Sequence, residues 1–203
     1  MADIGIMGGT FDPVHNGHLL LGRQAYEEYG LDFVWFMPSG QPPHKKDRQV
    51  TAKEDRCAMV KLALEGETGF LFSDFEVSRD GSTYTAQTLA LLKESFPADR
   101  FYYIVGADSL YEIEKWYHPE QVLTNVSLLV ADREYGGEHL PLRDQIRYLT
   151  DKYGACIRLL HCRETDIASE AIRRAVSQGR PIGTYVPAAV EDYIYRRHLY
   201  TTI

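Results

Sequence analysis

Short apolar stretches alternate with longer amphipathic segments along most of the chain. Apolar runs bounded by polar or glycine residues predict strands at residues 3–9, 33–37, 70–75, 101–105, 126–131 and 157–160. Apolar side chains at helical spacing predict helices at residues 17–29, 85–94, 142–153, 167–176 and 187–198. A further helix is expected to follow a capping box at Thr51 and Glu54 and to run to about residue 65.

Strands that alternate with helices in this way are typical of an α/β protein whose parallel sheet is covered on both faces. We therefore expect a doubly wound, Rossmann-like sheet that binds its ligands beyond the carboxyl ends of the strands. The sequence contains no internal repeat, low-complexity tract or linker. It predicts a single domain over residues 1–203, with residues 165–203 as a C-terminal helical subdomain packed on the rest.

Charge and cysteine content narrow the classes of function. The 203 residues carry 22 Lys and Arg against 29 Asp and Glu, a net charge of −7. This balance disfavours a domain that coats nucleic acid, although an acidic protein can still hold one positive pocket for a small anion. Cys57, Cys156 and Cys162 lack the spacing of a zinc ribbon and indicate free thiols. Without a membrane-length apolar run or a basic leader at the N-terminus, a cytoplasmic location without membrane contact is expected.

The first predicted strand leads into the segment GGTFDPVHNGH, residues 8–18. A doubly wound fold places its phosphate loop at this junction, where glycines allow close approach and the next helix presents free N–H groups. His15 and His18 can donate hydrogen bonds to phosphate oxygens. Metal ligation and a purely structural role are the competing interpretations, and no further metal ligands follow in the sequence.

The same segment resembles the HxGH signature of the nucleotidyltransferase superfamily, whose members transfer a nucleoside monophosphate from a nucleoside triphosphate. Residues 167–173 (IASEAIR) resemble its second hallmark, an ISSTxxR-like segment that opens a late helix. The match holds at Ile167, Ser169, Ile172 and Arg173. Ala168 stands where a serine is usual and Glu170 where a threonine is usual, which removes hydroxyl groups from the expected triphosphate site.

Three further segments are similar to those of bacterial nicotinate-nucleotide adenylyltransferases: PPHK at residues 42–45, STYT at 82–85 and KWY at 115–117. The resemblance implies that Thr85, Trp116 and the backbone of Tyr117 hold the nicotinate group. A tryptophan face can stack on a pyridine ring, and a threonine at a helix start can bind a carboxylate. A core role for Trp116 and a simple capping role for Thr85 remain open.

Other candidates are weaker. Asp108, after Gly106 at a strand end, suits a ribose hydroxyl or a helix cap. Lys45 and Lys46 can close over phosphates or form an ordinary solvated pair, and Arg133 is a candidate for the mononucleotide phosphate. The predicted ATP site comprises Gly8, Gly9, Thr10, Phe11, His15, His18, Lys45, Gly106, Asp108, Ile167, Ser169 and Arg173, of which His15, His18 and Arg173 are the predicted catalytic residues.

The implied reaction joins ATP and nicotinate mononucleotide to give nicotinate adenine dinucleotide and pyrophosphate. Mg²⁺ is expected on the ATP phosphates, without a dedicated set of protein ligands. An adenylyltransferase for nicotinamide mononucleotide or phosphopantetheine and a non-catalytic nucleotide-binding domain are the alternatives. Tyr193, Tyr195 and Tyr200 fit either a homo-oligomer interface or the core.

Overall fold

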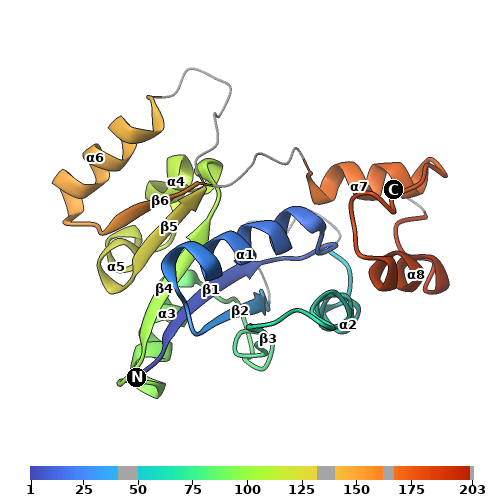
Figure 1. Cartoon of the computed structure of the whole chain (residues 1–203), viewed down its shortest axis with the longest axis horizontal. Helices are drawn as coiled ribbons and strands as arrows, with labels where there is room; N and C mark the ends of the chain where they lie inside the picture. Colours follow the sequence, from blue (N-terminus) through green and yellow to red (C-terminus); the bar gives the residue numbers. More distant parts are fainter. Residues whose placement is uncertain (41–49, 132–139, 162–166, 202–203) are drawn as a thin grey trace.

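The computed structural model describes residues 1–40, 50–131, 140–161 and 167–201. In these ranges six parallel strands form one sheet in the order β3-β2-β1-β4-β5-β6 (Figure 1). They are β1 (Asp3–Gly9), β2 (Phe33–Pro38), β3 (Phe70–Phe72), β4 (Arg100–Val105), β5 (Ser127–Ala131) and β6 (Ile157–Leu160). The chain moves outward from β1 to β3, returns to β4 beside β1 and then moves outward on the other side. Sheets of this topology bind ligands at that change of direction, here beyond the carboxyl ends of β1 and β4.

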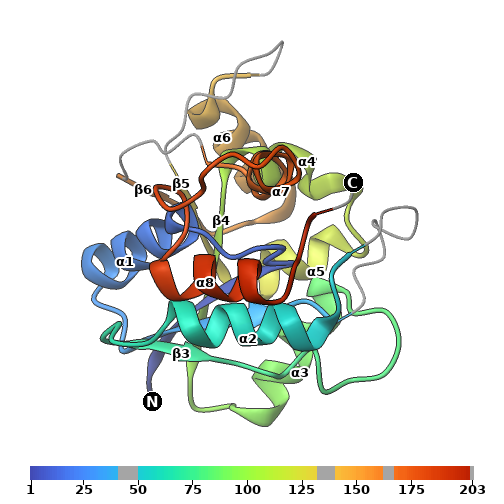
Figure 2. The same cartoon turned by 90° about the vertical axis from the view of Figure 1, so that its right-hand side faces the viewer.

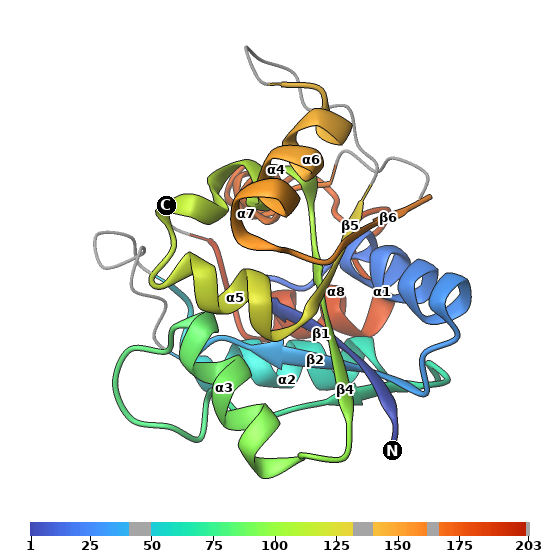
Figure 3. The same ribbon diagram turned by 90° about the vertical axis from the view of Figure 1, so that its left-hand side faces the viewer.

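Helices cover both faces of the sheet, which confirms the predicted doubly wound α/β fold (Figures 1 and 3). One face carries α1 (Asn16–Tyr29) and α2 (Lys53–Ala63), and α7 (Ser169–Ser177) and α8 (Ala188–Arg196) join the same core from beyond the strand ends. The other carries α3 (Thr85–Ser95), α4 (Ala107–Glu112), α5 (Pro119–Asn125) and α6 (Leu142–Tyr153).

The two cores follow from the alternation of side chains along each strand. Met7 and Ile104 belong to the core under α1, and their neighbours Ile6 and Tyr103 belong to the core under α3. Because both faces are buried, the strands read as continuous apolar runs in the sequence.

Several predicted boundaries were wrong. β3 ends at Phe72 instead of residue 75, because the chain turns there and the Ser78 N–H bonds the Asp74 carbonyl at 2.9 Å. The predicted capping box does not form: α2 has Ala52 as its N-cap, and the Thr51 N–H instead bonds Asp12 Oδ2 at 3.3 Å. The short helices α4, α5 and η2 (Ile113–Lys115) were not predicted, since none is long enough to show a clear period.

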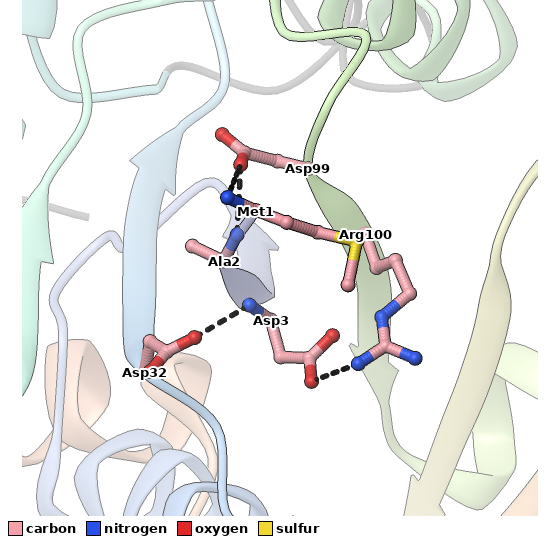
Figure 4. A network of polar contacts seen from close by, with 6 residues as sticks. All are labelled: Met1, Ala2, Asp3, Asp32, Asp99 and Arg100. Atoms are coloured by element: carbon pink, nitrogen blue, oxygen red, sulfur yellow. Dashed lines mark hydrogen bonds and ion pairs between the residues drawn. The ribbon is translucent and has the colours of Figure 1, made fainter.

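A polar network fixes the N-terminal edge of the sheet, opposite the expected ligand edge (Figure 4). The Ala2 N–H donates to Asp99 Oδ1 and the Asp3 N–H to Asp32 Oδ2, each at 2.8 Å. Arg100 Nη2 donates to Asp3 Oδ2 at 2.6 Å. These bonds join the start of β1 to the segments that enter β2 and β4, and so support the register of the three central strands.

The C-terminal helices lie beyond the carboxyl ends of β1 and β2 (Figure 1). Figure 2 shows α8 running alongside α2. Core residues of α7 and α8, including Ile172, Val190 and Ile194, belong to the same buried cluster as Met7 of β1 and Leu19 of α1. Within the described ranges, no helix combines the length and apolarity needed to cross a bilayer.

Candidate active site

β1 delivers the chain at Gly9 into a loop that ends at His15, the N-cap of α1. Gly8 lies against Tyr103 of β4: a Cβ at Gly8 would come within 2.6 Å of the Tyr103 hydroxyl oxygen. The glycine therefore allows a phenol to reach the end of β1. Phe11 is buried at a positive φ of 51°, with its ring edge against His18 at a centroid distance of 5.0 Å. Its side chain supports His18 from the core, and the N-terminal end of α1, with the positive end of the helix dipole, lies beside the two histidines.

The two predicted histidines lie together. Their rings stack with centroids 3.6 Å apart, and the His15 N–H donates to His18 Nδ1 at 3.2 Å. Because Nδ1 accepts this bond, a neutral His18 carries its proton on Nε2 and is a hydrogen-bond donor there.

Burial determines the protonation state of His15 and His18. Burial lowers the pKa of His15 to about 4. Burial and, to a lesser degree, the neighbouring His15 lower the pKa of His18 well below its ordinary value. Without a ligand, both rings are therefore neutral at pH 7. A bound polyphosphate acts in the opposite direction, since a nearby anion favours the imidazolium form.

The second hallmark segment is joined directly to the histidine loop. Arg173 Nη1 donates to the Asp12 carbonyl at 2.7 Å, and the Ser169 hydroxyl donates to the Pro13 carbonyl at 2.9 Å. Ser169 opens α7, and Ala168 is its N-cap without a side-chain bond. The structure thus brings together the two segments that the sequence singled out, although they are about 150 residues apart.

A cavity of about 350 Å³ runs along α7 from its start. Ile167 and Ala168 line one end, and Arg180 and Tyr185 also contribute to its wall. The Asn16 N–H donates to the Tyr185 carbonyl at 2.8 Å, which ties this wall to the start of α1. The predicted site residue Ile167 therefore faces a hollow next to the histidine loop.

Tyr103 joins the residues predicted for the other substrate. Its hydroxyl bonds the side chain of Thr85, the first residue of α3, and its ring meets that of Trp116 edge to face at 6.4 Å. Burial and the Glu76 carboxylate raise the pKa of Tyr103 to about 12, so its hydroxyl stays protonated. Gly8, Thr85 and Trp116 consequently meet around one phenol.

Trp116 has a core contact, as one of the two interpretations of the sequence expects, and its stacking on a ligand ring stays a prediction. It is only partly buried, and the buried part of its ring packs against the core under α3. Tyr117 is 45% exposed, with its ring 4.4 Å from that of Tyr84. Trp116 and Tyr117 directly follow η2, which the structure places beside α4 and α5.

Gly106 and Asp108 lie at the start of α4, directly after β4. Gly106 is the N-cap, and the Asp108 carboxylate folds back so closely that a Cβ on Gly106 would lie 2.5 Å from Asp108 Oδ1. Asp108 is exposed at the ligand edge of the sheet. Of the remaining candidates, Thr10 is partly buried in the loop after β1, whereas Lys45, Lys46 and Arg133 lie outside the described residues.

Sequence reasoning missed Arg56, which is only 2% exposed. Its guanidinium donates to four backbone carbonyls, those of Thr10, Ser39, Gly40 and Thr51, at 2.7 to 3.2 Å. It thereby clamps the loops that follow β1 and β2. An arginine in an amphipathic helix carries no signal that distinguishes such a clamp from a solvated charge.

The sequence singled out Asp12 only as a member of the segment at residues 8–18, without a role of its own. Asp12 is 4% exposed, and both carboxylate oxygens have partners, Tyr200 at 2.7 Å and the Thr51 N–H at 3.3 Å. Among the described residues, no group of three or more His, Cys, Asp or Glu side chains is arranged to hold a metal ion.

Comparison with known proteins places this geometry in a family. The model of the cytidylyltransferase-like family matches residues 6–175. A curated relative from Lachnoclostridium phytofermentans, named "Probable nicotinate-nucleotide adenylyltransferase", is 40% identical over 98% of this chain and 100% of its own length. A relative of the same name from Halalkalibacterium halodurans is 36% identical over 100% of this chain and 93% of its own.

Solved structures share the fold. The nicotinic acid mononucleotide adenylyltransferase of Plasmodium falciparum complexed with APC has a TM-score of 0.80 at 19% identity and covers 99% of this chain and 98% of its own. The same enzyme complexed with NaAD has a TM-score of 0.79 at 20% identity, with the same coverage.

Proposed function

This chain belongs to the cytidylyltransferase-like family, and on that premise we propose that it is a nicotinate-nucleotide adenylyltransferase of NAD biosynthesis. It transfers the adenylyl group of ATP to nicotinate mononucleotide and releases pyrophosphate. The observation that carries the proposal is the convergence of two sites at one sheet edge. The histidine loop with Arg173 suits a triphosphate, and the cluster around Tyr103 suits an aromatic acceptor.

The phosphate side combines neutral and charged donors. His18 presents an Nε2 proton, the start of α1 presents the positive end of its dipole, and Arg173 has guanidinium nitrogens beyond the one bonded to Asp12. We assign His18 to the charge that builds on the departing pyrophosphate, with His15 beside it. Arg173 and the start of α7 hold the β- and γ-phosphates.

The acceptor phosphate needs no general base. Its second pKa lies near 6, as in other phosphomonoesters, so it is mostly dianionic at pH 7 and attacks the α-phosphorus of ATP directly. The remaining barrier comes from holding two anions in line, which positioning and fixed donors lower. This division of labour fits a site whose two histidines rest as neutral imidazoles.

The acceptor ring is assigned to Thr85, Trp116 and the backbone of Tyr117. Tyr103 supports this assignment because it bonds Thr85 and packs against Trp116, and so fixes the two side chains relative to each other. Stacking on the exposed part of Trp116 suits a flat pyridine ring. A carboxylate on that ring suits the start of α3, where N–H groups are free.

Mg²⁺ fits the site as a companion of the ATP phosphates. Asp12 is the single carboxylate of the histidine loop, and both of its oxygens already accept hydrogen bonds. Phosphate oxygens and water therefore supply the ligands, as Mg²⁺ commonly prefers. When bound, the ion neutralises charge on the pyrophosphate.

The proposal also covers the domain organisation, the location and two further phosphate contacts. The chain works as one unit over residues 1–203, with the helices of 165–203 as a subdomain that supplies Arg173. It acts in the cytoplasm on small molecules without nucleic acid, which its acidic charge and its free Cys57 and Cys156 support. We also assign Lys45 to the ATP phosphates and Arg133 to the phosphate of the mononucleotide.

The test follows pyrophosphate release with ATP, Mg²⁺ and one acceptor at a time: nicotinate mononucleotide, nicotinamide mononucleotide or phosphopantetheine. We expect kcat/KM to be highest with nicotinate mononucleotide. Equal or better turnover of another acceptor would overturn the substrate assignment, and ATP binding without release under any acceptor would identify a nucleotide-binding domain.

His18→Ala tests the chemistry. Loss of a donor to the leaving group is expected to lower kcat by roughly 100-fold or more, with little change in KM for nicotinate mononucleotide. His161→Ala is the matched control, because His161 bonds Glu28 on the far side of α1 and its side chain is 74% exposed. A His18→Ala variant that turns over like the His161→Ala variant would refute the role.

A further inference from the structure

The Asp12 carboxyl group is an unusual feature of the histidine loop, because it is buried and both of its oxygens accept hydrogen bonds. Tyr200 donates its hydroxyl to Asp12 Oδ1 at 2.7 Å, and the Thr51 N–H donates to Oδ2 at 3.3 Å. The backbone carbonyl of Asp12 accepts from Arg173 at 2.7 Å. A buried carboxylate is costly to leave without partners, so these bonds hold the loop in one position.

Tyr200 reaches this carboxylate from the far end of the chain. It lies three residues from the C-terminus, and its φ of 61° is in the left-handed region that non-glycine residues rarely adopt. Its ring packs against the core under α1, and burial together with Asp12 raises the pKa of its hydroxyl above the ordinary value. Tyr200 therefore remains a hydrogen-bond donor throughout the neutral range.

The charges around this bond connect it to both sides of the loop. Arg173 lies close enough to Tyr200 to affect its titration, and Arg56 interacts electrostatically with both Asp12 and Tyr200. Arg56 in turn bonds the Thr10 carbonyl, two residues before Asp12. His15 follows Asp12 by three residues and stacks on His18.

We propose that Tyr200 is a positioning residue for adenylyl transfer. By holding the Asp12 side chain, it fixes the loop that carries His15 and His18, and it keeps the backbone carbonyl of Asp12 in place as the acceptor for Arg173. The inference rests on the proposed function. It links the segment that follows α8 to the histidine loop through Asp12.

The chain offers a matched control in Tyr193. Its hydroxyl donates to Asp55 Oδ1 of α2 at 2.8 Å, and Arg197 Nε donates to the same oxygen at 3.2 Å. Asp55 is 9% exposed. Tyr193→Phe therefore removes the same kind of bond from the same C-terminal segment, but leaves Asp12 untouched.

The experiment compares Tyr200→Phe with Tyr193→Phe in kcat, KM for both substrates and melting temperature. We expect Tyr200→Phe to lower kcat by about tenfold, which corresponds to about 1.4 kcal/mol in the barrier. Tyr193→Phe should stay within twofold of the wild type, even if it melts earlier. A Tyr200→Phe kcat within twofold of the wild type, or an equal loss in both variants, would overturn the proposal.

A double-mutant cycle tests the route through Asp12. If Tyr200 acts through that carboxylate, Tyr200→Phe should cost little further activity in an Asp12→Ala background. Independent, additive losses would overturn the route.

The imidazole ¹H–¹⁵N resonances of His15 and His18 provide a readout that needs no turnover. We expect them to shift in Tyr200→Phe and not in Tyr193→Phe, and unchanged resonances would overturn the proposal. If the wild type releases no pyrophosphate with any acceptor, the proposed function fails, and these resonances still decide the role of Tyr200.

Discussion

The stacked histidines show how burial sets the chemistry of a single residue. An imidazole at its ordinary pKa of 6.5 would be partly charged near neutrality. Here burial lowers the pKa of His15 to about 4 and that of His18 in the same direction, so both rest as neutral donors. The two rings thus add no positive charge to the loop when no ligand is bound, and a nearby polyanion would favour their protonated forms.

This burial predicts a pH dependence of stability for His15. Between pH 6.5 and about 4 the unfolded chain binds a proton at His15 that the folded chain does not, so stability falls as the pH falls. The loss amounts to about 3 kcal/mol once the pH is below the folded value. Urea unfolding of the wild type and of His15→Gln, at pH 7 and at pH 4.5, measures it.

The wild type should lose more stability than His15→Gln between these two pH values, because glutamine does not titrate. Other acidic groups titrate in both proteins and cancel in the comparison. Equal losses in the two proteins would show that His15 is not held neutral by the fold.

At the scale of elements, α6 is joined to the short turn η2 that precedes Trp116. Glu114 Oε1 accepts from Lys152 Nζ at 2.7 Å and from the Tyr153 hydroxyl at 2.8 Å. The hydrogen bonds from Lys152 and Tyr153 lower the pKa of Glu114, so the carboxylate stays charged. The predicted helix at 142–153 therefore steadies the segment before Trp116, which we propose for the acceptor site and which has no long helix of its own.

Removal of the Glu114 contacts with α6 should weaken binding of the acceptor. Glu114→Ala is expected to raise KM for nicotinate mononucleotide by about twofold to fivefold, because networks of partly exposed charges are worth about 1 kcal/mol or less. KM for ATP should not change. Steady-state kinetics in both substrates measures the difference.

Lys115→Ala is the control for this prediction. Lys115 lies in the same turn but pairs with Glu112 on the surface, with 73% of its side chain exposed. Its loss should leave both KM values unchanged. A Glu114→Ala variant with the same kinetics as Lys115→Ala would show that α6 does not steady the acceptor site.

The whole molecule shares one core between its N-terminal strands and its C-terminal helices. Ile172, Ile182, Val190 and Ile194 are at most 2% exposed, and they belong to the same cluster as Phe11 and Leu19. The C-terminal helices also hold the histidine loop through Arg173, Ser169 and Tyr200. Fold and site therefore depend on the same contacts.

A chain truncated after residue 164 should accordingly fail to fold cooperatively. It would expose the buried faces of α1 and α2 and leave the Asp12 carboxylate without Tyr200, at a cost of several kcal/mol against the modest stability of such domains. Circular dichroism melting of residues 1–164 beside the full chain measures this. A sharp transition within a few degrees of that of the full chain would mean that 165–203 is dispensable for folding.

The net charge of −7 says little about the local charge at the carboxyl edge of the sheet, where the histidine loop lies. Arg173 and Arg56 both lie at the histidine loop, where Asp12 compensates part of their charge. A triphosphate would meet a guanidinium and the N-termini of α1 and α7 there. Local placement of charge decides ligand binding, whereas the total charge contains no information about where the charges lie.

The sequence by itself determined the elements and the loop that carries the chemistry. Buried strands such as β1 and helices such as α6 are fixed by periodicity within about ten residues, and His15 and His18 are neighbours in one continuous motif. The doubly wound class follows from the alternation of the elements, and the confirmed fold needed no contact information beyond that.

Only the tertiary structure decided the strand order, the neutral state of the histidines and the partners of Asp12. Tyr200 and Asp12 are 188 positions apart, and Arg56 finds its acceptors on the two loops that follow β1 and β2. A hydrophobic period reports which face of an element is buried, but it contains no information about what lies opposite. Burial of a polar group, and hence its charge and its role, is a property of the packed molecule.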